Sequence, residues 1–126
     1  MHRFILFLCL CYAPLFAADI THTTVPLDQV KAATTAGSAV LIDVREQSEW
    51  DAGHLKGALL VPTSLLSAKD ATVPATIPKD KPIYLHCKAG VRALNMTKLL
   101  KEKCYDAHAL LPGYSELVKA GFEKAN

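Results

Sequence analysis

The sequence has little net charge and only one apolar run long enough to suggest contact with a membrane. Its 126 residues carry a net charge of +2 at pH 7, from 14 basic and 12 acidic residues spread along the chain. So small and dispersed a positive charge does not form the basic surface that nucleic-acid binding requires, and we expect no nucleic-acid partner. Hydrophobic residues make up 51% of the chain and charged residues 21%, which excludes a disordered or coiled-coil protein. The length allows one domain.

The apolar run lies at the N-terminus. Residues 4–16 carry no charge and are followed by two alanines. The run is shorter than the roughly 20 apolar residues of a transmembrane helix, and a proline interrupts it. We therefore predict a signal peptide over residues 1–17 and a mature domain over residues 18–126, rather than an uncleaved anchor. The predicted location is the periplasm, or the exterior if the source has no outer membrane, with no stable membrane insertion after cleavage.

Cleavage would remove two of the four cysteines and leave Cys87 and Cys104. In an exported protein, paired cysteines are normally oxidised to disulfides. A helix expected over residues 91–103 would hold these two roughly 18 Å apart, whereas a disulfide needs Cα atoms within about 7 Å of each other. We therefore expect the two cysteines not to pair, and we expect Cys104, where the chain leaves this helix, to be structural.

Short aliphatic runs alternate with segments of helical spacing, which is typical of an α/β domain. The clearest strands are residues 39–43 and 83–87, whose near-continuous apolar character implies burial on both faces and hence a parallel sheet. Weaker strands are expected at residues 20–23, 59–61 and 107–111. Helices are expected at residues 27–36, 47–51, 91–103 and 114–120. Residues 68–82, with three prolines, are predicted to form an extended surface connection.

A reactive cysteine is predicted where the second clear strand ends. Cys87 is followed by a short loop that contains Gly90 and leads into a helix. Such a loop can turn consecutive backbone amides toward the sulfur, and Gly90 supplies the conformational freedom for that turn. The amides, the helix dipole and the cations Lys88 and Arg92 all favour a thiolate, which is the nucleophilic form of cysteine. The alternative is a buried structural cysteine.

Other polar residues near the strand ends have simpler explanations. Asp43 and Arg45 follow the first clear strand, where an aspartate commonly fixes the next turn through its carboxylate, so we assign both a supporting role. His86 precedes Cys87, but side chains alternate along a strand, so its ring is expected to point away from the sulfur. His54 is expected to bond to backbone. No spacing of metal ligands occurs, so we expect no metal and no cofactor.

Two motifs resemble those of the rhodanese-like sulfurtransferases. The stretch LIDVREQSEWDAGHLKGALLVP, residues 41–62, is similar to the Asp-x-Arg and Gly-His-x-x-Gly-Ala segments of the family. The stretch HCKAGVRA, residues 86–93, is similar to its active-site loop, and LPGY follows near the C-terminus. The resemblance covers nearly the whole mature chain. It implies about five mostly parallel strands with helices on both faces, and a reactive loop at the carboxyl end of a central strand.

By this resemblance the protein is a thiosulfate sulfurtransferase and Cys87 is the catalytic residue, which carries a persulfide. The cysteine attacks the outer sulfur of a small anionic donor such as thiosulfate, sulfite departs, and a thiol, cyanide or a protein dithiol takes the bound sulfur. Asp43 and Arg45 brace the fold near the loop. The expected substrate-binding residues are those of the loop, with both cations at its mouth: Lys88, Ala89, Gly90, Val91 and Arg92.

Two other functions share this pattern. Related phosphatases place five residues between cysteine and arginine, whereas four lie between Cys87 and Arg92, and the smaller ring fits sulfur better than phosphate. The second alternative is a non-catalytic module that carries sulfur or binds a protein partner. Leu60 and Pro112 depart from the family pattern and leave the substrate preference and the shape of the rim open.

Overall fold

The computed structural model describes residues 19–126, so the predicted signal peptide lies outside the described residues. In this part of the chain four parallel strands form a sheet of order β2-β1-β3-β4. The strands are β1 (Val40–Asp43), β2 (Leu59–Leu60), β3 (Ile83–His86) and β4 (Ala107–Ala109). The helices are α1 (Leu27–Ala36), α2 (Gln47–Ala52), α3 (Thr63–Leu66), α4 (Val91–Glu102) and α5 (Tyr114–Lys119). The predicted α/β class is confirmed. No helix within residues 19–126 is both long and apolar enough to span a membrane.

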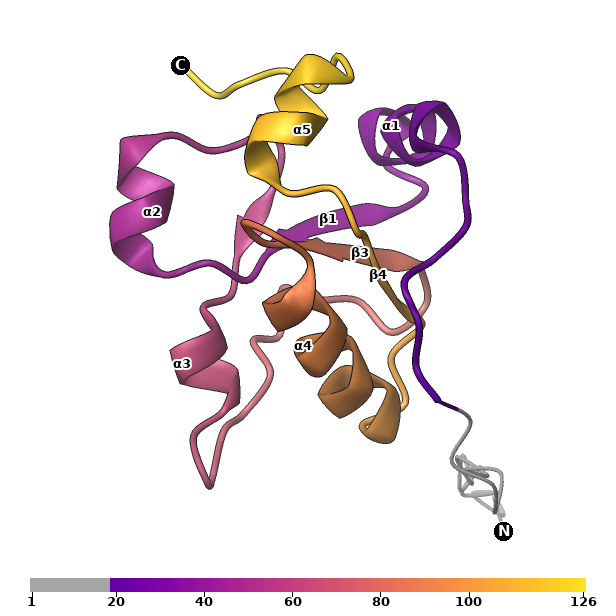
Figure 1. The fold of residues 1–126 in the computed structure, drawn as a ribbon. Coiled ribbons are helices and arrows are strands. Elements are labelled where there is room, and N and C mark those ends of the chain that lie inside the picture. Colours follow the sequence, from indigo (N-terminus) through magenta and orange to yellow (C-terminus); the bar gives the residue numbers. More distant parts are fainter. Residues whose placement is uncertain (1–18) are drawn as a thin grey trace, which may run out of the picture.

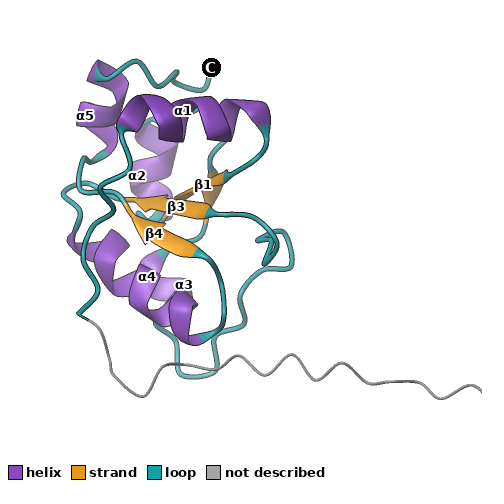
Figure 2. Ribbon diagram, turned by 90° about the vertical axis from the view of Figure 1, so that its right-hand side faces the viewer, coloured by secondary structure: helices purple, strands orange, loops and turns teal. Residues whose placement is uncertain are grey.

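Helices cover both faces of the sheet, with α1 and α5 on one face and α3 and α4 on the other (Figures 1 and 2). Alternating residues of β1 supply the two cores: Leu41 packs in the cluster that includes α1 and α5, and Ile42 in the one that includes α4. Both side chains are at most 3% exposed. Burying each one contributes about 1.5–3 kcal/mol. The sheet is therefore held rigidly from both sides, and its carboxyl edge is a fixed platform.

Local sequence signals set the ends of the helices that surround this edge. At α2, the Glu46 carboxylate accepts from the backbone of Glu49 while the Glu49 carboxylate accepts from the Glu46 amide at 3.1 Å, a reciprocal cap. Helix α4 begins directly after Gly90, whose φ is 91°. It ends at Glu102, two residues before Cys104, which has the left-handed φ of 68°. Helix α2 and the start of α4 lie next to each other near the carboxyl edge of the sheet.

Two elements differ from the sequence-based expectations. The expected strand at residues 20–23 is not a strand. Among the described hydrogen bonds, only that from the Thr23 amide to the Ala109 carbonyl, at 2.8 Å, joins this polar segment to β4, and one bond does not form a ladder. Helix α3 was not expected, because a helix of 4 residues is too short to show a period. The extended connection before β3 is confirmed, and Ile77, only 4% exposed, anchors it to the core.

Candidate active site

The candidate site lies where β1 and β3 end side by side. Asp43 and His86 are register partners in the last rung of this parallel pair. Cys87 follows at once, and the chain then turns through residues 88–90 into α4. Ligand sites of parallel α/β sheets form at this carboxyl edge. The structure therefore places the predicted loop at the end of a central strand, as expected.

Cys87 is a free thiol that is only 1% exposed. The Gly90 amide donates to its Sγ atom at 3.0 Å, and among the described contacts it is the one backbone amide that does so. Helix α4, 12 residues long, begins at the next residue, so the positive end of its dipole lies behind the sulfur. An amide donor and a helix N-terminus both stabilise negative charge on sulfur. The environment of Cys87 therefore suits a thiolate or a persulfide anion.

Gly90 is held from the N-terminal side of the chain as well. His22 Nε2 donates to the Gly90 carbonyl at 2.9 Å, a contact that sequence analysis did not anticipate. A Cβ atom at position 90 would lie 2.9 Å from the Leu111 carbonyl oxygen and 3.0 Å from His22 Nε2. The loop thus needs glycine here for two reasons, its positive φ and the close approach of two other segments.

The Leu-Pro-Gly-Tyr segment packs directly against the loop. The Tyr114 amide donates to the Cys87 carbonyl at 2.9 Å. A Cβ atom on Gly113 would lie 1.8 Å from the Lys88 carbonyl oxygen, so no side chain fits between these two backbones. Gly113 has φ −88°, which any residue adopts, so space rather than backbone conformation requires glycine. The segment thereby fixes the height of the loop above the sheet.

Asp43 and Arg45 form a buried ion pair beneath this edge, with 0% and 5% exposure. The Arg45 amide donates to Asp43 Oδ1 at 3.0 Å, which is the turn-fixing contact predicted for this aspartate. Arg45 Nη2 donates to Asp43 Oδ2 at 2.7 Å and to the Gly53 carbonyl at 2.8 Å, and the guanidinium lies 4.4 Å from the centre of the Tyr114 ring. The pair therefore ties β1 to the end of α2 and the start of α5. This geometry fits the expected bracing role.

His86 is fully buried beside this pair, with Nε2 3.8 Å from Asp43 Oδ2. Burial lowers the pKa of His86, and the Asp43 carboxylate opposes that shift only in part. Neither ring nitrogen has a hydrogen-bond partner among the described residues. His86 therefore makes no described hydrogen bond to the sulfur. His54 bonds to the Trp50 carbonyl at 3.1 Å, so the backbone contact expected for it is confirmed.

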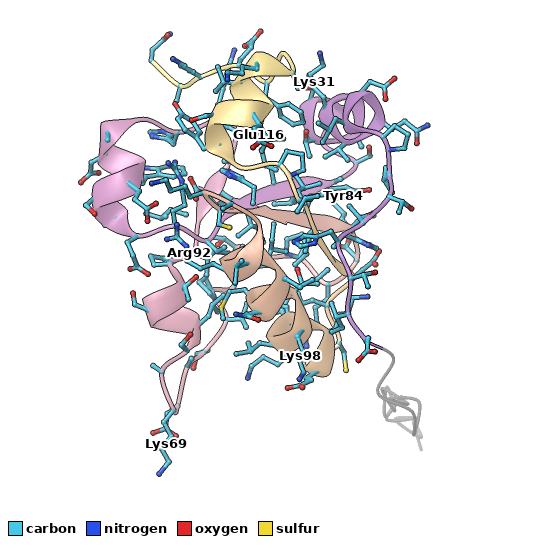
Figure 3. All side chains as sticks on the ribbon, in the orientation of Figure 1. Lys31, Lys69, Tyr84, Arg92, Lys98 and Glu116 are labelled. Carbon is cyan, nitrogen blue, oxygen red and sulfur yellow. The ribbon has the colours of Figure 1, made fainter. Side chains whose placement is uncertain are left out.

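Arg92 is paired with a residue that sequence analysis did not assign to the site. Its Nη1 and Nη2 atoms donate to Glu49 Oε1 and Oε2 at 2.6 and 3.0 Å, and Figure 3 shows Arg92 at the start of α4, on the side of α2. The hydrogen bond from Arg92 lowers the pKa of Glu49 to about 2, and the same contact raises the pKa of Arg92. The charge of Arg92 is therefore neutralised locally, whereas Lys88 is exposed and has no oppositely charged partner within residues 19–126.

A pocket of about 280 Å³ opens beside the loop, between α2 and the start of α5. It is lined by Arg45, Glu49, Ala52, Gly53, Lys88, Tyr114 and Ser115. A larger cavity of about 690 Å³ lies between α1 and residues 121–123, but no cysteine or histidine lines it. The smaller pocket is the better candidate for the substrate because Lys88, the residue that follows Cys87, lines it. No group of three potential metal-ligating side chains occurs within residues 19–126.

The predicted loop residues therefore have different surroundings. Lys88 lines the pocket and Gly90 contacts the sulfur, whereas Ala89 is exposed on the loop and Val91 is exposed at the start of α4. Sequence analysis missed His22, Glu49, Gly113 and Tyr114 as residues that hold the loop or its arginine. The cap formed by Glu46 and Glu49 was readable from their spacing, but nothing in the sequence joined Glu49 to Arg92.

The fold and the site combine a parallel α/β domain with a buried cysteine, which lies in a glycine-containing loop at the end of a central strand. A family model described as "Rhodanese-like domain" matches residues 26–120. The chain therefore belongs to the family of rhodanese-like domains.

Relatives of known sequence and structure agree with this assignment. The chain is 37% identical over 73 residues to a probable adenylyltransferase/sulfurtransferase, MoeZ, of Mycobacterium tuberculosis, a match that covers 58% of this chain and 18% of that protein. It is 33% identical over 92 residues to the human thiosulfate:glutathione sulfurtransferase, over 65% of this chain and 80% of that protein. Among solved structures, the human single-domain sulfurtransferase TSTD1 is similar with a TM-score of 0.65 and 27% identity, over 81% of this chain and 96% of that one. The chain thus spans less than a fifth of the length of the Mycobacterium tuberculosis relative.

Proposed function

We propose that this protein is a sulfurtransferase that moves a sulfane sulfur from thiosulfate or a similar donor to a thiophilic acceptor. The observation that carries the proposal is the environment of Cys87: a free thiol whose sulfur accepts from the Gly90 amide, at 3.0 Å, directly before the N-terminus of α4. Few other positions in a fold stabilise an anionic sulfur through backbone groups alone. The adjoining pocket, with Lys88 on its wall, supplies room and charge for a small anion.

The proposed reaction has two displacements that share one site. The Cys87 thiolate attacks the outer sulfur of thiosulfate, a sulfur–sulfur bond forms to Sγ, and the bond to the sulfonate sulfur breaks. Sulfite leaves with the electron pair of that bond, so the charge of −3 is the same on both sides. A thiol, cyanide or protein dithiol then attacks the outer sulfur and returns Cys87 to the thiolate. In this reaction the Gly90 amide, which donates to Sγ, stabilises negative charge on both the thiolate and the persulfide.

The proposal includes export of the protein. Under it, residues 1–17 are removed and the mature chain acts in the periplasm, or outside a cell that lacks an outer membrane. A lone reactive thiol in such a compartment oxidises irreversibly unless it rests as a persulfide, so the purified protein should carry extra sulfur. N-terminal sequencing of the protein from its host and the intact mass before and after a reductant test both points. A chain that begins at Met1 contradicts export, and a mass that the reductant leaves unchanged contradicts the persulfide.

Turnover by the Cys87→Ser variant tests the chemistry. Sulfite release from thiosulfate, with cyanide as acceptor, should fall to the background rate in this variant while its circular dichroism stays that of the wild type. A second thiol should not restore it, so Thr72→Cys, on the exposed connection, is added to Cys87→Ser as the control. Sulfite release at the wild-type rate by either variant overturns the proposal. A wild-type protein that binds a partner yet turns over no sulfur donor also overturns it, in favour of a non-catalytic module.

A further inference from the structure

The charges around the pocket are mostly compensated in pairs. Arg45 is paired with Asp43, and Arg92 with Glu49. These two cations and two carboxylates cancel, so Lys88 is left as the single uncompensated charge among the described residues at the pocket. A thiolate on Cys87 would neutralise even that charge. The site is therefore much less positive than a loop with both a lysine and an arginine suggests.

Glu49 is the residue that produces this balance. Its carboxylate lines the pocket and holds both terminal nitrogens of Arg92, at 2.6 and 3.0 Å. The two side chains are about one-third exposed, at 31% and 30%, and Glu49 is the member of the pair that lines the pocket. The carboxylate is ionised at neutral pH, and the hydrogen bond from Arg92 keeps it ionised in mild acid as well by lowering the pKa of Glu49 to about 2. An incoming anion thus meets a negative charge on the wall of the pocket that Lys88 also lines.

We propose that Glu49 is a specificity-determining residue, which disfavours sulfur donors with two negative charges relative to donors with one. The inference rests on the proposed sulfurtransferase function and names a property of the same site. Its basis is Coulombic: a dianion such as thiosulfate interacts with the Glu49 carboxylate about twice as strongly as a monoanion such as methanethiosulfonate. For charges that share a small, partly solvated pocket, this difference in repulsion energy between the two donors corresponds to a change of roughly fivefold to tenfold in the ratio of their kcat/KM values.

The chemistry of both donors is the same, so only charge differs. Methanethiosulfonate gives its outer sulfur to the Cys87 thiolate and leaves as methanesulfinate, with a total charge of −2 before and after the step. The ratio of kcat/KM for thiosulfate to that for methanethiosulfonate therefore reports charge selection. It cancels changes in the reactivity of the thiolate that affect both donors alike.

Three variants separate charge from structure. Glu49→Gln keeps the size of the side chain and an oxygen for the Glu46 amide, which Glu49 now binds at 3.1 Å, but it removes the charge. Glu49→Asp keeps the charge and shortens the side chain. The matched control is Glu46→Gln. Glu46 is the N-terminal cap of α2, its carboxylate accepts from the Ser64 hydroxyl at 2.6 Å, and it does not line the pocket.

The proposal predicts that Glu49→Gln raises the ratio roughly fivefold to tenfold at low ionic strength, and that high salt reduces this gain. Glu49→Asp and Glu46→Gln should each stay within about twofold of the wild type. A ratio that does not rise in Glu49→Gln, or that rises equally in Glu46→Gln, overturns the proposal. If Glu49→Gln does not fold, as judged by its thermal unfolding, Glu49→Met provides the same charge removal and the same criterion.

Failure of this inference is distinguishable from failure of the proposed function. A wild-type protein that turns over neither donor refutes the sulfurtransferase function itself. A wild-type protein that turns over both donors, with a ratio insensitive to position 49, refutes only the role of Glu49.

Discussion

Gly113→Ala should both destabilise the protein and disable the loop. A Cβ atom at this position would lie 1.8 Å from the Lys88 carbonyl oxygen, 2.4 Å from the Lys88 carbonyl carbon and 3.1 Å from the Cys87 carbonyl oxygen. All three are backbone atoms, so no side-chain rotation relieves the contact. The start of α5 and the loop must therefore move apart by about 1 Å or more before ordinary van der Waals distances return.

The expected cost follows from two contributions. Overpacking that shifts backbone costs about 1–3 kcal/mol. The separation also breaks the 2.9 Å hydrogen bond from the Tyr114 amide to the Cys87 carbonyl, worth about 1 kcal/mol. The sum is about 2–4 kcal/mol, a large part of the roughly 5–15 kcal/mol of a typical domain. Displacement of the loop by this amount should also lower kcat/KM by about 100-fold, because catalysis depends on atomic placement at this scale.

Urea unfolding and sulfite release measure the two effects. Gly57→Ala is the control: Gly57 also has a positive φ, of 78°, yet its added Cβ meets no atom within 4 Å. That variant should lose about 1–2 kcal/mol through backbone strain and keep its turnover. The reasoning is refuted if Gly113→Ala unfolds within about 0.5 kcal/mol of the wild type, the ordinary range for a neutral surface substitution, and turns over at the wild-type rate.

Two further predictions concern the ion pairs. The pKa of Glu49 is lowered from 4.5 to about 2 in the folded protein, so its pair with Arg92 stabilises the fold above pH 4.5, and this contribution is lost as the pH falls toward 2. Because the side chains are about one-third exposed, we expect this contribution to be about 1 kcal/mol. In Glu49→Gln, the free energy of unfolding should therefore fall less steeply as the pH is lowered from 4.5. An unchanged pH dependence contradicts this. Arg45→Lys should cost about 2–3 kcal/mol in chemical unfolding, because an ammonium group cannot bind both Asp43 oxygens and the Gly53 carbonyl together. Lys56→Arg, in a pair whose side chains are 72% and 74% exposed, should have no measurable effect, and equal losses in the two variants contradict the assignment.

Local patterns explain why much of the fold was predictable. The helix Leu27–Ala36 lies where its spacing and the glycine that follows it predict, and that glycine has the expected left-handed φ of 78°. The strands Val40–Asp43 and Ile83–His86 are apolar on both faces because helices cover both faces. The position of Cys87 at the end of a strand follows from the same information. Each of these features is decided by residues close together in the sequence.

Contacts between distant segments were not predictable in this way. The pair of Glu49 with Arg92 joins residues 43 positions apart, and the bond from His22 to Gly90 spans 68 positions. Neither pairing leaves a local pattern, because each depends on how α2 and the N-terminal segment pack around the loop. The expectation that Arg92 adds positive charge to the mouth of the loop therefore missed its carboxylate partner. The close approach of Gly113 to Lys88 is likewise visible only once the chain has folded.

Under the proposed function, the contact of the Leu-Pro-Gly-Tyr segment with the loop sets the stage of biosynthesis at which Cys87 gains its supporting backbone contacts. The ribosome makes the chain from its N-terminus, so Cys87 emerges before residues 111–114, which support its carbonyl and fix the height of its loop. Until these residues and α5 have docked, Cys87 lacks the hydrogen bond from the Tyr114 amide to its carbonyl. Chemical competence thus comes last, after nearly the whole domain has been synthesised, and a prematurely terminated chain would contain the nucleophile without its activity.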